Sequence, residues 1–126
     1  MPRLTRTRPV LAVPDLARSA AFYRDALGFT VREVGDSGWR FFERDGLIIM
    51  AGECVDALPA TELGDHSYCT YVDVEGIDAY FAEVAPRLAA AGGSLIKHLR
   101  TEPWGMREFG VRTVDGHRMM FGERVQ

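Results

Sequence analysis

Three histidines are the side chains in this sequence best suited to metal binding or to proton transfer near neutral pH. They are His66, His98 and His117, and their spacing matches no metal-ligand motif. We expect His66 at the start of a strand, His98 within another strand, and His117 exposed directly after a turn. The histidines therefore predict no metal site or acid–base site of their own.

The nucleophile candidates Ser67 and Cys69 also lack a recognisable base partner, so the sequence gives no support to covalent catalysis. Two cysteines are too few for a disulfide framework, and these two do not have the spacing of a redox pair. This cysteine usage indicates a reducing compartment, and we expect a cytoplasmic protein.

Aromatic and apolar side chains remain as candidates, and such groups usually line small-molecule sites. Because side chains alternate along a strand, Trp39 and Phe41 are expected on one face, as are Ile48 and Met50 on the next strand. Trp104 follows a proline in a predicted loop, where an aromatic ring can cover the mouth of a cleft. Aromatic faces stack on planar ring systems and attract cations.

The second half of the chain offers a similar set. Alternation would place Ser67, Cys69 and Tyr71 on one face of a strand, and Arg118 and Met120 on one face of the last strand. The neighbours Arg107 and Glu108 are a weaker candidate, because such a pair is typical of protein surfaces. The complete predicted ligand-binding set is Trp39, Phe41, Ile48, Met50, Cys69, Tyr71, Trp104, Arg107, Arg118 and Met120.

Core packing is the alternative interpretation for several aromatic residues, because most aromatic side chains in a domain of this size are buried. It applies to Trp39, Phe41 and Phe109. Arg8 belongs to a basic N-terminal segment and is either an anion contact inside the cavity or a solvated charge.

The candidates lie around a sequence unit that occurs twice. Residues 45–53 read DGLIIMAGE and residues 115–123 read DGHRMMFGE, so both copies start with Asp-Gly, carry Met at the same place and end in Gly-Glu. Repeated sequence indicates repeated structure. We therefore expect two half-domains built alike, facing a shared concavity.

Each half is predicted to follow a β-α-β-β-β order. Asp15 is expected to cap a helix over residues 16–27, and a second helix over residues 77–91 contains Pro86, which should kink or split it. Residues 52–65 are expected to link the halves, with a helical turn. The strands are predicted at residues 10–13, 29–34, 39–44, 47–51, 66–74, 94–99, 106–112 and 117–121.

Composition narrows the classes of partner. The chain has 126 residues, 47% of them hydrophobic and 26% charged, which is typical of one globular domain. A net charge of −3 argues against nucleic-acid binding, where a basic surface is expected. No apolar run approaches the length of a membrane span, and the N-terminus lacks the apolar stretch of a secretory signal.

Two segments resemble a known superfamily. Residues 13–29, VPDLARSAAFYRDALGF, resemble the opening of a vicinal-oxygen-chelate domain, of the glyoxalase/bleomycin-resistance/dioxygenase superfamily. Residues 103–112 and 115–118 resemble the closing signature of its bleomycin-resistance-like branch. The resemblance implies an α+β fold in which two βαβββ modules form a curved mixed sheet around a cleft. Module one would span about residues 8–53, the linker about 54–65 and module two about 66–123.

The resemblance also locates the metal positions. Catalytic members hold a divalent ion with His and Glu from the first and last strand of each half, and these positions fall here on Arg8, Met50, Cys69 and Met120, with Ser67 in place of Cys69 if the register shifts by two. Arg repels a cation and thioethers are weak ligands except for soft metals. A soft Cys-Met-Met site is the alternative, but Met more often fills space. We expect no metal and no other cofactor.

Pairing with a second copy follows from the resemblance as well. Proteins of this kind commonly form homodimers in which each cavity takes halves of two chains, sometimes after exchange of the first strand. Residues 8–11, Arg-Pro-Val-Leu, would begin that strand, and a proline suits a strand start because it lacks an N–H donor.

We therefore expect a metal-free small-molecule binding protein of the antibiotic-resistance type, which sequesters an aromatic or planar compound in an apolar cleft. One alternative is an enzyme of the same superfamily, such as a lyase, isomerase or dioxygenase, with an unorthodox metal site through His66 or with no metal. A second alternative is a dimeric interaction module with a vestigial pocket.

Overall fold

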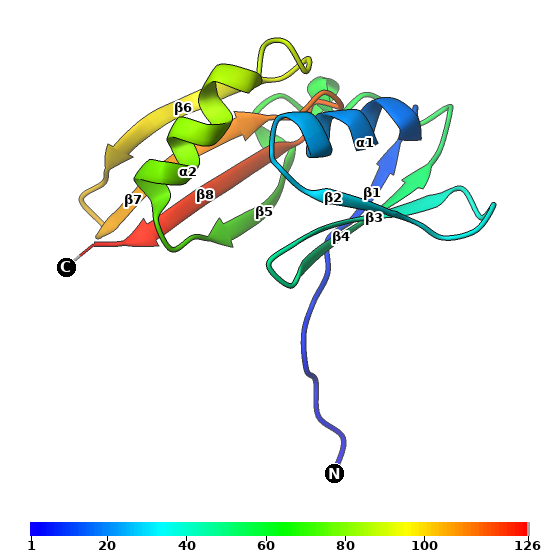
Figure 1. The fold of residues 1–126 in the computed structure, drawn as a ribbon, viewed down its shortest axis with the longest axis horizontal. Coiled ribbons are helices and arrows are strands. Elements are labelled where there is room, and N and C mark those ends of the chain that lie inside the picture. Colours follow the sequence, from blue (N-terminus) through cyan, green and yellow to red (C-terminus); the bar gives the residue numbers. More distant parts are fainter. Residues whose placement is uncertain (126) are drawn as a thin grey trace.

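Two four-stranded mixed sheets, each with one helix, make up the chain in the computed structural model, which describes residues 1–125 (Figure 1). The strand orders are β1-β4-β3-β2 and β5-β8-β7-β6, so the α+β fold with two β-α-β-β-β halves is confirmed. The elements are β1 (Val10–Val13), α1 (Leu16–Asp25), β2 (Thr30–Glu33), β3 (Trp39–Arg44), β4 (Leu47–Glu53), β5 (Tyr68–Asp73), α2 (Ile77–Val84), β6 (Ser94–Thr101), β7 (Met106–Arg112) and β8 (Arg118–Arg124).

The first strand of each half pairs in parallel with the last strand of the same half. Val10 in β1 lies opposite Met50 in β4, and Tyr71 in β5 lies opposite Met120 in β8. The remaining neighbours pair antiparallel. The two methionines that recur in the sequence repeat therefore occupy equivalent places in the two sheets.

The glutamates that end the two repeats also make equivalent contacts, because each accepts at least one hydrogen bond from an N–H group at the start of a helix. Glu53 Oε2 accepts a hydrogen bond of 3.0 Å from the backbone N–H of Leu16, at the start of α1. Glu123 accepts bonds of 3.2 and 3.1 Å from the backbone N–H groups of Gly76 and Ile77, at the start of α2. The first N–H groups of a helix have no partner within the helix, and a carboxylate there also opposes the positive end of the helix dipole. Each repeat thus fixes its own helix to its own sheet.

Helix α1 begins where the sequence predicts, since Asp15 Oδ1 accepts a hydrogen bond of 3.1 Å from the Arg18 N–H. Helix α2 is shorter than predicted. It ends at Val84 and continues only as a 3-10 turn over Ala85–Arg87, so the expected helix to residue 91 is wrong in its last part. Pro86 provides the reason, because it has no N–H to donate to the preceding turn and its ring crowds the carbonyl there, although Ala85 before it keeps helical dihedrals.

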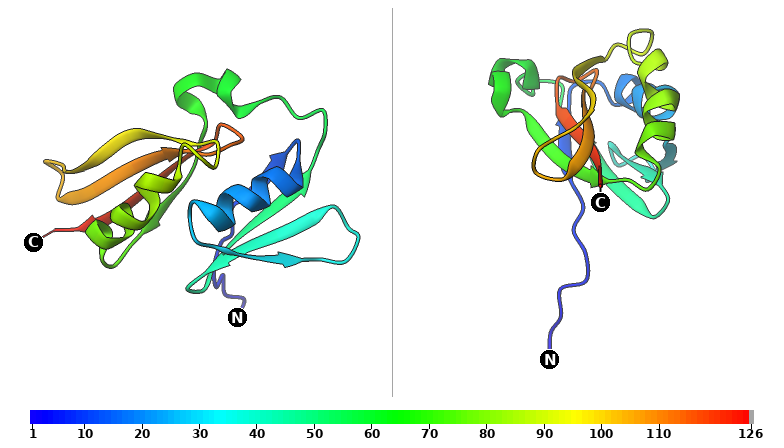
Figure 2. Two further views of the ribbon diagram at one scale, coloured as in Figure 1. Left: turned by 45° about the horizontal axis from the view of Figure 1, so that its top comes forward. Right: turned by 90° about the vertical axis from the view of Figure 1, so that its left-hand side faces the viewer.

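One continuous hydrophobic core joins the two halves, and Figure 2 shows α1 lying over the first sheet and α2 over the second. Tyr23 of α1 stacks on Phe42 of β3 with ring centres 4.4 Å apart, and its hydroxyl lies 3.6 Å from the sulfur of Met119 in β8. Phe109 is fully buried and stacks on Phe121, so core packing is the correct interpretation for that residue.

Polar contacts also connect the halves. The Ser19 hydroxyl of α1 donates a bond of 2.7 Å to Asp115 in the β7–β8 turn. Arg44 Nη1 at the end of β3 lies 2.6 Å from Glu83 of α2. The linker carries a 3-10 helix over Ala60–His66, as expected.

Residues 1–9 belong to no helix or strand and project from the body of the chain (Figure 1). Met1 and Leu4 are fully exposed at the end of this segment. None of the described helices is both long and apolar enough to span a membrane.

Candidate functional site

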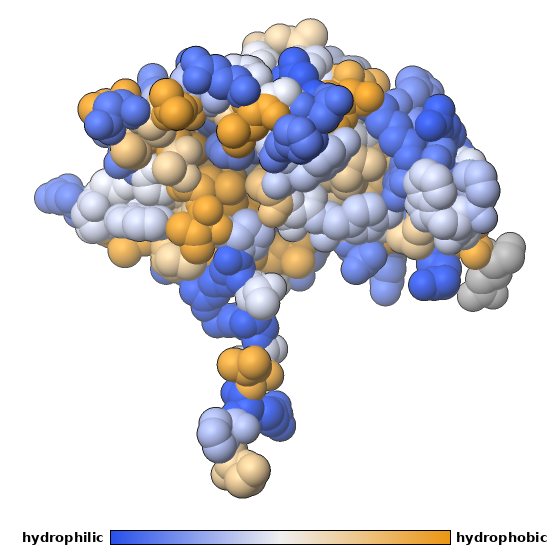
Figure 3. All heavy atoms as spheres, turned by 180° about the vertical axis from the view of Figure 1, so that it is seen from behind, coloured by the Kyte–Doolittle hydropathy of each residue, from blue (hydrophilic) through white to orange (hydrophobic). Residues whose placement is uncertain are grey.

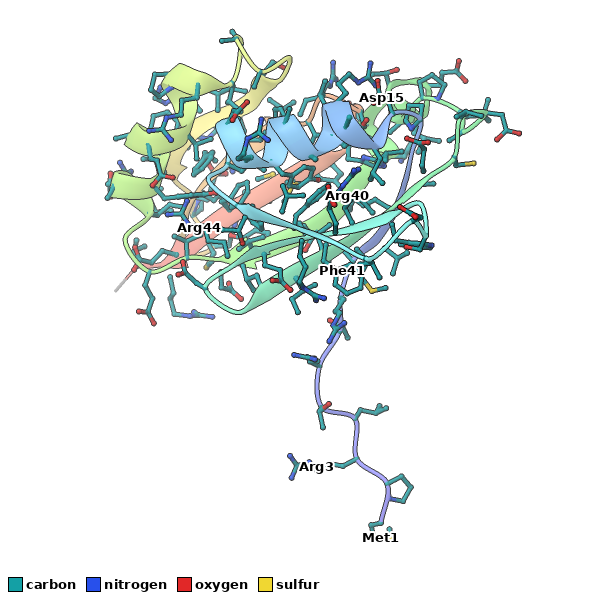
Figure 4. The ribbon with its side chains drawn as sticks, turned by 45° about the vertical axis from the view of Figure 1, so that its right-hand side comes forward. Met1, Arg3, Asp15, Arg40, Phe41 and Arg44 are labelled. Carbon is teal, nitrogen blue, oxygen red and sulfur yellow. The ribbon has the colours of Figure 1, made fainter. Side chains whose placement is uncertain are left out.

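Each sheet packs one face against the core and leaves the other face outside it. The first open face, as we name it, alternates along β3 and β4 with the core residues Phe42 and Ile49. Figure 4 shows Phe41 on this outer side of β3, whereas its neighbour Arg40 points toward α1. The first open face consists of Val10, Trp39, Phe41, Ile48, Met50 and Gly52.

Aromatic rings dominate the first open face. Trp39 packs over Gly52, where a Cβ atom would lie only 3.0 Å from the ring, and it keeps 37% of its surface exposed. Arg32 of β2 covers the Phe41 ring at 4.6 Å. Figure 3 shows apolar side chains gathered around the base of the projecting N-terminal segment. The face can therefore offer flat apolar surface to a ring system.

The second open face lies on β5, β7 and β8 and alternates with the core residues Phe109, Val111, Met119 and Phe121. At Gly122 an added Cβ would collide with the Tyr71 hydroxyl, so this glycine makes room for the tyrosine as Gly52 does for Trp39. The second open face consists of Tyr71, Glu108, Gly110, Arg112, Arg118, Met120 and Gly122.

A buried charged network crosses the second open face. The Tyr71 hydroxyl donates to Glu108 Oε2 at 2.5 Å, and Lys97 Nζ donates to the other carboxylate oxygen at 2.8 Å. Lys97 also lies 3.5 Å from Glu102, which pairs with Arg100. Every charge in this network has a partner of opposite sign.

The network changes the proton affinity of its members. Burial raises the pKa of Glu108, which is 4% exposed, but the hydrogen bonds from Lys97 and Tyr71 outweigh burial and lower that pKa below its ordinary value. Burial and the bond to Glu108 raise the pKa of Tyr71. Glu108 is therefore held as a carboxylate and Tyr71 as a neutral donor.

Trp104 lies at the end of this network. The ammonium of Lys97 is 5.1 Å from the centre of its ring, within cation–π range, yet the ring is 62% exposed. The loop position expected for Trp104 is confirmed, since it falls between β6 and β7. One face of the ring is held by a cation and the rest remains open to a ligand.

A cavity of about 540 Å³ lies between the two halves and is lined by one residue of each open face. The N-terminal segment forms one side of it, the start of β4 a second side and β5 a third. Its lining includes Ile48 from the first open face and Tyr71 from the second, together with Arg8, Phe29 and Cys69. The volume suits a drug-sized molecule. A second cavity of about 600 Å³ lies beside Arg44, Tyr80 and Glu83 on the helix side.

The structure divides the predicted set between the first cavity, the two open faces and other parts of the chain. Ile48, Cys69 and Tyr71 line the first cavity, as does Arg8. Trp39, Phe41 and Met50 share the first open face, and Arg118 and Met120 share the second. Arg107 lies apart from them, since it pairs with Asp78 of α2 at 2.8 Å on the helix side of β7.

Strand alternation fails at Cys69. A β-bulge between Tyr68 and Thr70 inserts one residue, so Tyr68 lies opposite Arg118, Tyr71 lies opposite Met120, and Cys69 packs against the core. The expected common face for Ser67, Cys69 and Tyr71 is therefore wrong. Burial raises the pKa of the Cys69 thiol to about 11, which keeps it protonated at neutral pH.

The residues at the four metal positions do not fit a divalent cation. They offer the guanidinium of Arg8, the thioethers of Met50 and Met120, and the protonated thiol of Cys69. None of these is a good ligand for Zn²⁺, Mn²⁺ or Fe²⁺. Within residues 1–125, no three His, Cys, Asp or Glu side chains are grouped as they would be around a metal ion.

One of the three histidines lies as expected. His98 is in β6, and its ring packs edge-on against Phe81. His66 is exposed but ends the 3-10 helix Ala60–His66 and does not begin the strand, because β5 starts only at Tyr68. His117 is half-buried rather than exposed, because its backbone N–H is held by Thr113 in the β7–β8 turn. Burial lowers the pKa of His117.

Sequence reasoning missed Lys97 and Arg112, and it gave Glu108 only as the neighbour of Arg107 in a pair typical of surfaces. Their signal is the alternation of Glu108, Gly110 and Arg112 along β7, opposite Gly122, Met120 and Arg118 of β8. The Gly-Glu that ends each repeat was a further signal of these faces, since an aromatic side chain packs against each of the two glycines.

Two joined β-α-β-β-β halves, each presenting an open sheet face beside a common cavity, define the class of this domain. The chain belongs to the glyoxalase/bleomycin resistance protein/dioxygenase superfamily, whose family model matches residues 5–121. Its bleomycin-resistance-like character is supported by its relatives. Bleomycin resistance proteins of Geobacillus stearothermophilus and Staphylococcus aureus are 27% identical over 137 residues, which cover 94% of this chain and 96% of theirs.

Solved structures share the fold. The bleomycin-binding protein of bleomycin-producing Streptomyces verticillus, complexed with copper(II)-bleomycin, superposes with a TM-score of 0.74 at 24% identity, over 96% of this chain and 97% of that one. A bleomycin resistance determinant encoded on the transposon Tn5 gives a TM-score of 0.75 at 18% identity, over 96% and 98%.

Proposed function

We propose that this protein sequesters an aromatic or planar small molecule, without a bound metal and without changing a bond in it. The curated relatives named bleomycin resistance protein support a binding and sequestering role. The observation that carries the proposal is the seating of an aromatic ring on a glycine in each open face, Trp39 on Gly52 and Tyr71 on Gly122. Aromatic rings seated on the two sheet faces, one of them beside the first cavity, suit stacking on a planar ligand.

The donor chemistry of Arg8, Met50, Cys69 and Met120 supports the metal-free part of the proposal. In place of ligands for a divalent cation, these positions carry apolar or positively charged side chains. The bound compound would rest against thioethers, which adapt to irregular ligand shapes. The unpaired cysteines Cys54 and Cys69 support a reducing, cytoplasmic location.

We also propose that the protein works as a homodimer. The projecting residues 1–9 and the apolar first open face support this, since both would be covered by a second copy. A two-fold dimer would make two equivalent clefts. Sedimentation velocity at micromolar concentration tests the point, and a monomer at every concentration would contradict it.

Binding can be followed with the two tryptophans, because Trp39 and Trp104 are the only ones in the sequence. We expect metal-free bleomycin, or a planar aromatic dye used as a probe, to quench their emission saturably. Trp104→Ala should weaken binding at least tenfold while unfolding stability changes by less than about 0.5 kcal/mol, the usual range for an exposed position. Leu63→Ala, at an exposed position in the linker, serves as the control.

Elemental analysis separates this proposal from the enzyme alternative. Protein purified without chelators should contain no stoichiometric Zn, Ni, Fe or Mn, and EDTA should leave both the melting temperature and the probe affinity unchanged. A bound metal in equimolar amount, ligated by this chain, would replace the proposal with an enzyme of the superfamily.

A further inference from the structure

Two arginines lie directly opposite one another on the second open face. Arg112 of β7 and Arg118 of β8 are paired residues in the antiparallel ladder, next to the Gly110–Met120 pair. Both alternate with core residues, Val111 and Met119, so both side chains belong to the outer side of the sheet. Like charges directly opposite each other destabilise a sheet unless something neutralises them.

Neither arginine has all of its buried donors satisfied within the described chain. The Nε atoms of Arg112 and Arg118 are both buried and have no hydrogen-bond partner among residues 1–125. Arg118 Nη2 does reach Asp65 at 2.9 Å, but the Asp65 side chain is 87% exposed and water weakens such a pair. Arg112 forms no ion pair in the same range of residues, and Tyr68 covers Arg118 at 5.6 Å. Two buried donors thus remain, both on positively charged groups.

The rest of the second open face has no excess of positive charge. Lys97 is balanced by Glu108 and Glu102, and Arg100 is balanced by Glu102. The uncompensated positive charge of this face is therefore confined to the Arg112–Arg118 end. A guanidinium presents its N–H groups in a planar fork that matches the two oxygens of a carboxylate, sulfonate or phosphate.

We propose that the Arg112–Arg118 pair is an anion subsite, and that the sequestered aromatic compound carries an oxyanion group. This inference rests on the proposed function and narrows its ligand class to aromatic acids. Arg118 lies two positions before Met120 on the same face of the strand, a distance of about 7 Å. A ring resting on Met120 and Tyr71 therefore lies within reach of the arginines through an acid group on the ring or on a short arm.

The test uses two probes with the same ring system and opposite charges, naphthalene-2-sulfonate and naphthalen-2-ylmethylammonium, with sodium sulfate as a third ligand that lacks the ring. Calorimetric titration at fixed ionic strength should give at least tenfold tighter binding of the sulfonate than of the ammonium. Arg112→Met and Arg118→Met should each weaken sulfonate binding at least tenfold and leave ammonium binding unchanged.

Arg124→Met provides the matched control, because it removes the same charge from the exposed end of β8. It should alter neither affinity. Arg112→Met leaves the Arg118–Asp65 pair intact, so it tests the inference even if Arg118→Met fails to fold.

The outcomes separate the inference from the proposed function. Equal binding of the two naphthalene probes, or tighter binding of the ammonium, overturns the anion subsite and leaves an aromatic-binding protein. Binding of sulfate alone, with no aromatic probe or bleomycin bound, overturns both. A third outcome also overturns the inference. If Arg112→Met abolishes the dimer and leaves the sulfonate affinity unchanged, the two arginines contact the partner chain and not an anionic ligand.

Discussion

Gly122 shows how much one residue decides on the second open face. The glycine leaves space for the Tyr71 hydroxyl, which then reaches Glu108, and Glu108 in turn holds Lys97 beside Trp104. A side chain at position 122 would push the tyrosine out of this arrangement. The position of Trp104 thus depends on a residue in another strand that does not touch it.

Gly122→Ala is expected to destabilise the protein by about 1–3 kcal/mol, the usual cost of inserting a methyl group into a filled space. Chemical denaturation would measure the loss. In a Tyr71→Ala background the same substitution should cost much less, because the colliding hydroxyl is gone. An equal cost in both backgrounds would show that the tyrosine is not what the glycine accommodates.

Acid should weaken the fold through Glu108. Its pKa is lowered in the folded protein relative to the ordinary value of 4.5, so the unfolded chain binds the proton more readily. The stabilisation is then fully present above pH about 4.5 and is lost as the pH falls through the lower folded pKa. Melting temperatures between pH 7 and pH 3 should fall less steeply for Glu108→Gln than for the unchanged protein. Parallel curves would contradict this assignment.

Sequence reasoning worked for single residues whose environment is local, and Trp104 is the example. Pro103 and Gly105 on either side predict a turn, and a turn residue is exposed. Glu108 could not be predicted in this way, because its burial depends on Tyr71 and Lys97 from two other strands. The bulge at Cys69 is likewise a property of the pairing between β5 and β8 and leaves no mark in residues 66–71 alone.

The two helices are attached to their sheets by different numbers of polar contacts. Helix α1 has both Asp15 as an N-cap and Glu53 from β4 at its start. Helix α2 starts from Gly76, which has no side chain to cap it, so Glu123 of β8 is the carboxylate that meets its first N–H groups. The second helix should therefore depend more on its repeat glutamate.

Glu123→Ala is expected to cost about 1 kcal/mol or slightly more, in the range measured for helix N-caps, and Glu53→Ala less. Thermal unfolding followed by circular dichroism would rank the two. Glu75→Ala is the matched control, since it removes a carboxylate from an exposed position just before α2. If Glu75→Ala cost as much as Glu123→Ala, general charge near the helix and not these hydrogen bonds would explain the effect.

Most element positions follow from short-range signals. The Asp-Gly turns place β3 and β4, and both β3 and β7 have the predicted bounds. The observed strand ends differ from the predicted ones where pairing with a neighbouring strand determines the end. Strand β4 runs to Glu53 and not to residue 51, because β1 pairs with Gly52 and Glu53 along its edge.

The relation between the two halves is set by the core and by a few buried polar contacts. Asp115 is 6% exposed and accepts a hydrogen bond from Ser19 of the other half. Arg18 lies 3.4 Å from the same carboxylate but is itself half-exposed. The sequence repeat predicts two like halves, but it contains no pattern that pairs Ser19 with Asp115, which are 96 residues apart.

Ser19→Ala should destabilise the whole molecule by about 1–3 kcal/mol, because it leaves a buried carboxylate oxygen without its donor. Urea denaturation would give the value, and one cooperative transition is expected. Ser37→Ala, in the exposed turn between β2 and β3, is the control and should have little effect. A similar value for both serines would mean that the bond to Asp115 contributes little to joining the halves.

The exposed linker has a consequence for the integrity of the chain. Val55 and Leu58 are both about four-fifths exposed, at 80% and 81%, whereas the contacts that hold the halves together come from residues before and after them. We expect brief thermolysin treatment to cut there and produce two fragments that remain associated and elute together. A single proteolytic nick would thus convert one polypeptide into a non-covalent heterodimer of its own halves.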